Sequence, residues 1–116
     1  GYMVLAEKLH ENPGMSGAFN FGPDPEDCLT VEEVVQIASQ FWPANPGWTT
    51  DTGDHFHEST DLAIENSRAR ELLGVAPVWN SETAIERTTQ WYRQFYAGAS
   101  AETLCREDID AFKEMA

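Results

Sequence analysis

Residues 80–98 read NSETAIERTTQWYRQFYAG and carry the strongest helical pattern in this 116-residue chain. Apolar and aromatic side chains recur there at intervals of three and four, which is the spacing of one helix face. Asn80 or Ser81 can cap the start of the helix, and Gly98 ends the pattern. The aromatic residues of this face are predicted to pack in the core, as are the other tryptophans: Trp91, Tyr92, Phe95 and Tyr96, with Trp42, Trp48 and Trp79.

Two helices are predicted near the start of the chain. Thr30 and Glu33 form a capping box, and apolar residues follow at helical spacing through residues 31–41. Residues 2–9 are also helical in character, but no capping side chain precedes them. Because a helix normally begins with a cap, we expect this chain to be cut from something longer.

Two shorter helices are predicted around the central one. Asn66 or Ser67 opens the first, and Gly74 stands where a helix stop needs a left-handed residue. The second is a weaker pattern from about Arg106 to Met115, with its apolar residues on one side.

Three short segments are predicted to be extended, namely residues 17–21, 47–51 and 62–64. Residues 22–27 follow the first of these segments and are rich in Pro and Asp. They are therefore predicted to form a solvated acidic loop. The sum is an α+β fold with several helices and two or three short strands. The length fits one small domain over residues 1–116.

The charge is strongly acidic, with 7 Lys and Arg against 20 Asp and Glu and a net charge of −13. Such a surface repels phosphate backbones and anionic lipid, which argues against nucleic-acid and membrane-surface binding. Cys28 and Cys105 form no disulfide framework and are predicted to be reduced thiols. The chain shows no signal peptide and no apolar run of membrane-spanning length, so a cytoplasmic location is predicted.

Three motifs occur in the order and with gaps similar to those of one enzyme family. They are GAFNFGPDPED at residues 17–27, GDHFHE at 53–58 and GVAPVWN at 74–80. Together with the helix that ends in Trp91-Tyr92, they resemble the C-terminal part of CDP-glucose 4,6-dehydratases, which are extended short-chain dehydrogenases/reductases. By that resemblance the parent enzyme has a Rossmann lobe that holds NAD and a smaller C-terminal lobe that holds most of the nucleotide sugar.

The resemblance implies that this chain is the substrate-binding lobe and is not catalytic alone. It contains no Gly-rich dinucleotide fingerprint, and none of its three tyrosines is followed by Lys four residues later. Whether the chain belongs to an enzyme is therefore undecided, and its partner is either a missing Rossmann lobe or another copy of itself. The alternatives are a self-associating, non-catalytic module, or the lobe of a sister nucleotide-sugar epimerase or dehydratase.

The substrate-binding candidates are Asn20, His55, His57 and Glu58, and the expected ligand is a CDP-glucose-like nucleotide sugar. An asparagine amide can donate to a phosphate and accept from a ribose hydroxyl, although it can equally stabilise its own loop. Histidine can donate to a phosphate oxygen, although residues 53–58 can equally form an exposed polar loop.

Other readings of the loop remain open. His55 and His57 with nearby carboxylates offer metal ligands, but the spacing of a closed site is lacking, so no native metal site is predicted. Where the family has an aromatic residue and a lysine, this chain has Asp61 and Ala63. That change weakens attraction for a diphosphate, and it indicates either a different ligand preference or a decayed site.

Overall fold

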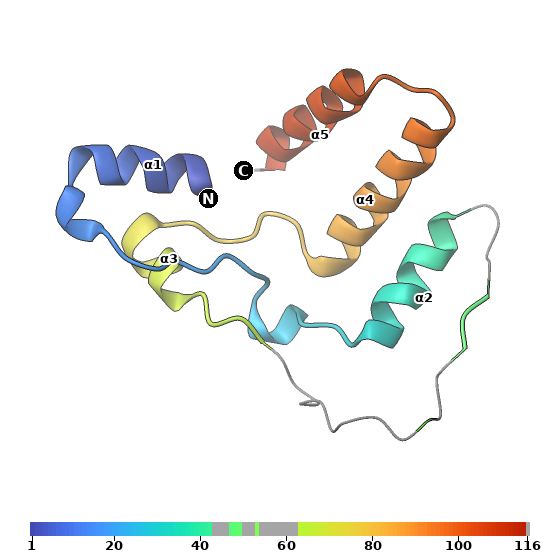
Figure 1. Cartoon of the computed structure of the whole chain (residues 1–116), viewed down its shortest axis with the longest axis horizontal. Helices are drawn as coiled ribbons and strands as arrows, with labels where there is room; N and C mark the ends of the chain where they lie inside the picture. Colours follow the sequence, from blue (N-terminus) through green and yellow to red (C-terminus); the bar gives the residue numbers. More distant parts are fainter. Residues whose placement is uncertain (43–46, 50–52, 54–62, 116) are drawn as a thin grey trace.

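A computed structural model of the chain describes residues 1–42, 47–49, 53 and 63–115 (Figure 1). Helix α4 packs beside α2 and α5, while α1 and α3 lie together on the other side of the molecule. None of the described helices is both long and apolar enough to cross a membrane. The elements, in chain order, are α1 (Tyr2–Glu11), η1 (Pro13–Met15), η2 (Pro25–Asp27), α2 (Val31–Phe41), α3 (Ser67–Leu73), α4 (Ser81–Tyr96) and α5 (Ala101–Met115).

The predicted α+β fold class is wrong, because the described residues form helices and no strand. Residues 17–21, 47–49 and 63–64 are described and belong to no regular element, whereas residues 50–51 and 62 lie outside the described part. A strand needs a ladder of backbone hydrogen bonds to a neighbour. Residues 20–23 do meet residues 65–66, but asparagine side chains rather than backbone groups make the hydrogen bonds.

The predicted capping box at the start of α2 is confirmed. The Thr30 amide donates to Glu33 Oε2 at 2.8 Å, and the Glu33 amide donates to Thr30 Oγ1 at 3.3 Å. These reciprocal bonds satisfy two N–H groups that a helix start would otherwise leave unpaired. The structure therefore fixes the start of α2 at the residue that the sequence indicated.

The predicted cap of α4 and the predicted stop of α3 are also confirmed. Asn80 Oδ1 accepts from the Thr83 amide at 2.9 Å. Gly74 ends α3 with a left-handed φ of 68°, which a residue without a Cβ adopts at little cost.

Helix α5 starts at Ala101, about five residues earlier than predicted. The Thr103 amide donates to the Ser100 hydroxyl at 3.4 Å, so Ser100 supplies the start signal that the prediction overlooked. Leu104, Asp108 and Phe112 share one face at intervals of four. Asp108 is charged and therefore interrupts the apolar pattern by which a helix is predicted. In the structure it forms an ion pair with Arg87 of α4, with 2.7 Å between Arg87 Nη2 and Asp108 Oδ1.

The described core is small, since its buried apolar side chains are Ala69, Leu73 and Leu104. The prediction that the aromatic face of α4 is core is wrong for three of its four residues. Trp91 is half-buried, but Tyr92, Phe95 and Tyr96 are 48%, 42% and 72% exposed. Among the other tryptophans, Trp42 and Trp79 are half-buried and contact rings, whereas Trp48 is exposed.

Candidate functional site

A hollow of about 440 Å³ lies on the side of the molecule that carries α1 and α3. It is bounded by residues 20–23, by residues 75–79 and by the end of α5. The hollow brings together residues far apart in the sequence, which is the usual way a binding site is assembled. The lining residues that matter most below are Asn20, Phe21, Asn66, Trp79 and Phe112.

Two asparagines join the wall of the hollow. Asn20 Nδ2 donates to the Glu65 carbonyl at 3.1 Å, and Asn66 Nδ2 donates to the carbonyls of Gly22 and Pro23 at 2.9 and 3.0 Å. Asn66 is only 8% exposed. Its amide therefore supplies the hydrogen bonds that water would otherwise give to these two backbone carbonyls. Asn20 itself is exposed, and its side-chain carbonyl oxygen can accept a hydrogen bond.

Asn66 was predicted as a possible helix cap, and it is the N-cap residue of α3, but its side chain makes no capping hydrogen bond. The first amide of α3 instead donates from Ser67 to Glu65 Oε1 at 2.8 Å. Hydrogen bonds from the Ser67 side chain and then its backbone amide lower the pKa of Glu65 from its ordinary value of 4.5. With the helix start satisfied by Glu65, the Asn66 amide is available to hold the facing loop.

The acidic loop is not solvated in the way that was predicted, because two of its carboxylates make contacts across the chain. Asp24 forms an ion pair with Arg70 of α3. Asp27 Oδ2 accepts from the Ser81 amide at 2.6 Å, and the Asp27 carbonyl accepts from the Ser81 hydroxyl at 2.7 Å. A carboxylate at the first turn of α4 also suits the positive end of the helix dipole.

Arg68 adds a cation beside the same loop. Its guanidinium carbon lies 4.6 Å from the centroid of the Phe19 ring, which is cation–π distance. Gly17 permits this approach, since a Cβ there would lie 2.6 Å from Arg68 Nη2. Both arginines of α3 therefore lie against the loop that carries Asn20.

Trp79 forms the opposite wall of the hollow. Its ring meets Phe112 of α5 edge-on at 5.5 Å, and the Arg87 guanidinium lies 4.8 Å from the ring centroid. Its Nε1 is buried and has no hydrogen-bond partner among the described residues. A buried N–H without an acceptor is costly.

The other sequence-predicted site residues, His55, His57 and Glu58, lie outside the described residues, and so do the metal ligands considered with them. Within the described part, no group of three or more His, Cys, Asp or Glu residues is placed to hold a metal ion. Cys28 and Cys105 are exposed free thiols. Of the predicted site residues, the structure thus places Asn20, and it adds Asn66 and Trp79.

The chain is similar to CDP-glucose 4,6-dehydratase. It is 30% identical over 113 residues to the CDP-glucose 4,6-dehydratase of Salmonella typhimurium. The match covers 97% of this chain but 32% of that protein, within its C-terminal part. No family model and no solved structure matches the chain.

The similarity to CDP-glucose 4,6-dehydratase confirms the resemblance that the motifs indicated. The chain spans about a third of the length of the dehydratase it matches. Because the matched region is nearly the whole chain, the hollow and its two asparagines belong to the part that is similar to the dehydratase.

Proposed function

We propose that this chain supplies part of the nucleotide-sugar site of a CDP-glucose 4,6-dehydratase-like enzyme, and that the hollow beside Asn20 receives the ligand. The observation that carries the proposal is the similarity along 97% of the chain to a CDP-glucose 4,6-dehydratase. The hollow supports it, because donors and aromatic rings from separate segments converge there.

Each wall has a role in this proposal. Asn20 presents an amide that donates to a phosphate or ribose oxygen and accepts from a hydroxyl. The Trp79 and Phe112 rings give the hollow an apolar surface for a base or sugar ring. Asn66 does not touch the ligand and serves to position the Asn20 loop.

The charge of the ligand also enters the proposal. A diphosphate is repelled by a chain of net charge −13, so cations or N–H donors must gather locally. Arg68 lies beside the loop, and Arg70 is already paired with Asp24. We assign the remaining diphosphate contacts to His55 and His57, with Glu58 as a hydrogen-bond acceptor for the sugar.

The residues of this chain do not fit NAD. The sequence contains neither a Gly-rich dinucleotide fingerprint nor the Tyr-x-x-x-Lys spacing. In the proposal, NAD and the proton-transferring tyrosine therefore belong to a Rossmann lobe outside this chain. The chain binds and orients the nucleotide sugar and does not carry out the reaction by itself.

Thermal-shift titration with CDP-glucose tests the proposal, using Asn20→Asp and the matched control Asn12→Asp. Binding to the folded chain raises the melting temperature by mass action. We expect Asn20→Asp to weaken CDP-glucose binding about tenfold, or about 1.4 kcal/mol, because a carboxylate repels phosphate and cannot donate. Asn12 lies at η1, where its oxygen accepts from the Gly14 amide, so its aspartate variant keeps that contact and the wild-type affinity.

Four ligands make the outcome decisive. A shift with CDP-glucose and CDP that exceeds the shift with dTDP-glucose supports the proposal, and NAD should cause none. A preference for dTDP-glucose would favour a sister nucleotide-sugar enzyme. Equal loss of affinity in both variants, or no shift with any nucleotide sugar from a cooperatively melting chain, would contradict the proposed site.

A further inference from the structure

Arg87 lies on α4 at a point where three segments of the chain meet. It contacts α5 through Asp108 and the segment before α4 through Trp79. Trp79 lines the hollow together with Phe112 of α5, whereas Arg87 is not among the described lining residues. Arg87 therefore stands behind the wall of the hollow, in contact with a residue that lines it.

The contact between Arg87 and Asp108 orients the guanidinium. Arg87 Nε donates to Asp108 Oδ1 at 2.9 Å, and Arg87 Nη2 lies 2.7 Å from the same oxygen. Both side chains are 32% exposed, so water screens this pair less than it screens a pair on the open surface. Because two nitrogen atoms of a planar group take part, the pair fixes the direction of the guanidinium as well as its distance.

The same guanidinium holds the ring of Trp79. Its central carbon lies 4.8 Å from the ring centroid, which is cation–π distance, and tryptophan is the ring that attracts a cation most strongly. Trp79 belongs to no helix, so side-chain contacts decide where its ring lies. The second of these contacts is with Phe112, whose ring meets the indole edge-on at 5.5 Å.

The two contacts of α5 act as one unit. Asp108 and Phe112 are four residues apart and share a face of the helix. One of them meets Arg87 and the other meets Trp79, and Arg87 and Trp79 contact each other. A loss of the guanidinium would therefore release the indole and one of the two contacts that fix α5 against the wall of the hollow.

We propose that Arg87 is a positioning residue of the hollow, which holds the Trp79 ring directly and the Phe112 ring through Asp108. A binding site needs its wall held to within about 0.5 Å by residues that do not touch the ligand. The inference rests on the proposed function for its ligand, CDP-glucose. The position of the Trp79 ring can be measured without a ligand.

The affinity for CDP-glucose is the first measurement. Arg87→Met removes the guanidinium and keeps an apolar stem, and we expect the Kd to rise about fivefold, as for other contacting residues. Arg93→Met is the matched control on the same helix, with the same loss of charge. Arg93 donates to the Phe41 carbonyl of α2 at 3.2 Å and does not line the hollow, so the Kd should be unchanged. Arg87→Lys keeps a cation and should recover part of the affinity.

Two further variants separate positioning from a general loss of stability. In a Trp79→Leu background, Arg87→Met should change the Kd by less than about twofold, because the ring through which Arg87 acts is gone. Asp108→Asn makes the chain less acidic, which by itself favours an anionic ligand. The inference predicts the opposite, a weaker affinity for CDP-glucose, because the guanidinium loses its charged partner.

Hydrogen exchange of the Trp79 indole provides the measurement without a ligand. Its Nε1 is buried in the wild-type chain, and we expect Arg87→Met to speed exchange of this N–H at least about tenfold by loosening the ring. Asp108→Asn should speed it less, and it replaces Arg87→Met if circular dichroism shows that the latter has lost its helices. Arg93→Met should leave the rate unchanged.

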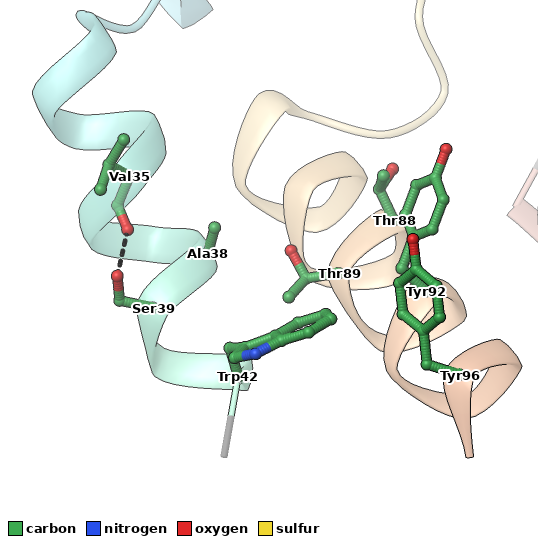
Figure 2. Close-up of a pocket in the computed structure, with 8 residues that line it drawn as sticks. All are labelled: Val35, Ala38, Ser39, Trp42, Thr88, Thr89, Tyr92 and Tyr96. Atoms are coloured by element: carbon green, nitrogen blue, oxygen red, sulfur yellow. Dashed lines mark hydrogen bonds between the residues drawn. The ribbon is translucent and has the colours of Figure 1, made fainter. Parts of the chain in front are cut away.

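Trp42 serves as an internal reference for the exchange rates. It lies in a second concave surface of about 450 Å³ between α2 and α4, which shares no residue with the hollow (Figure 2). We name this surface the aromatic groove, with a lining that includes Val35, Ala38, Trp42, Thr88, Tyr92 and Tyr96. Exchange of the Trp42 indole should be the same in the Arg87→Met, Asp108→Asn and wild-type chains.

Three results would overturn the inference. The first is a CDP-glucose Kd that is the same in Arg87→Met as in Arg93→Met. The second is an equal loss of affinity from Arg87→Met with and without the Trp79 ring. The third is unchanged exchange of the Trp79 indole in Arg87→Met. A wild-type chain that does not bind CDP-glucose contradicts the proposed function alone, and the exchange rate of Trp79 then decides whether Arg87 positions the ring.

Discussion

The two concave sides of this molecule are held together by different kinds of contact. Beside the hollow, side-chain hydrogen bonds and an ion pair connect residues 20–27 with residues 65–81. Both segments contribute side chains to these contacts. Beside the aromatic groove, α2 and α4 meet through apolar and aromatic side chains, and much of that surface stays exposed. The first side is held by polar contacts, whereas the described part of the second leaves apolar side chains exposed.

This difference in contacts indicates different roles for the two sides. Directional hydrogen bonds fix the position of a loop, which a binding site for a polar ligand requires. Exposed side chains that make no such bonds can be exchanged at little cost. Changes on the hollow side should therefore alter folding and ligand binding, and changes of exposed side chains on the groove side should alter neither.

The largest expected effect comes from Asn66→Asp. The new carboxylate cannot donate, and it faces the carbonyls of Gly22 and Pro23 that now receive the amide at 2.9 and 3.0 Å. We expect the free energy of unfolding to fall by about 2 kcal/mol, the typical cost of leaving buried acceptors unpaired. Urea denaturation of the variant and of the wild-type chain measures this loss.

Asn12→Asp is again the matched control, because Asn12 accepts rather than donates. Its unfolding midpoint should remain that of the wild-type chain. If Asn66→Asp is as stable as the wild-type chain, the side-chain hydrogen bonds do not stabilise the wall of the hollow. The proposed difference between the two sides would then be wrong.

A smaller effect on folding is expected from Tyr96→Lys. Tyr96 is 72% exposed, and a lysine near the end of α4 suits the negative end of the helix dipole. The free energy of unfolding should change by less than about 0.5 kcal/mol, as for most surface substitutions. A loss as large as that of Asn66→Asp would show that the groove is part of the core.

The smallest effect concerns the start of α2, where Glu33 is fully exposed. Hydrogen bonds from the Thr30 amide and then its hydroxyl lower the pKa of Glu33 from its ordinary value of 4.5. A lowered carboxyl pKa contributes stability that is present above the unfolded value and is lost as pH falls through the folded value. The helix signal at 222 nm should therefore be steady down to about pH 4.5 and decline below it.

Glu33→Gln separates this titration from the capping box. A glutamine oxygen still accepts from the Thr30 amide but does not ionise, so the decline of the helix signal below pH 4.5 should be shallower in the variant. Identical acid titrations of variant and wild type would show that other carboxylates set the pH response.

Local signals were the part of the fold that the sequence could predict. Thr30 with Glu33, Asn80 with Thr83, and Gly74 act through neighbours a few residues away, and each was confirmed. The described residues form none of the predicted strands, because pairing depends on distant segments, and here the side chains of Asn20 and Asn66 make the hydrogen bonds between residues 20–23 and 65–66. Helical spacing identified the apolar face of α4, but spacing alone cannot tell a buried face from an exposed one.

The candidate site was predictable to a lesser degree. Asn20 could be found because it stands in a motif, whereas Asn66 carries no signal beyond its suitability as a cap, which Glu65 makes unnecessary. Trp79 was taken for a packing residue, since a sequence does not reveal that an indole N–H is buried without an acceptor.

One NMR experiment tests the separation of the two sides most directly. Trp79 lines the hollow and Trp42 lines the surface between α2 and α4, so a single ¹H–¹⁵N spectrum of the two indole groups reports on both sides. Our account predicts that CDP-glucose shifts the Trp79 indole and the Asn20 amide signals without moving Trp42. Tyr96→Lys, which removes a ring 6.3 Å from that of Trp42, should shift Trp42 without moving Trp79. Trp42 responding to CDP-glucose, or Trp79 responding to Tyr96→Lys, would contradict the assignment of separate roles to the two sides.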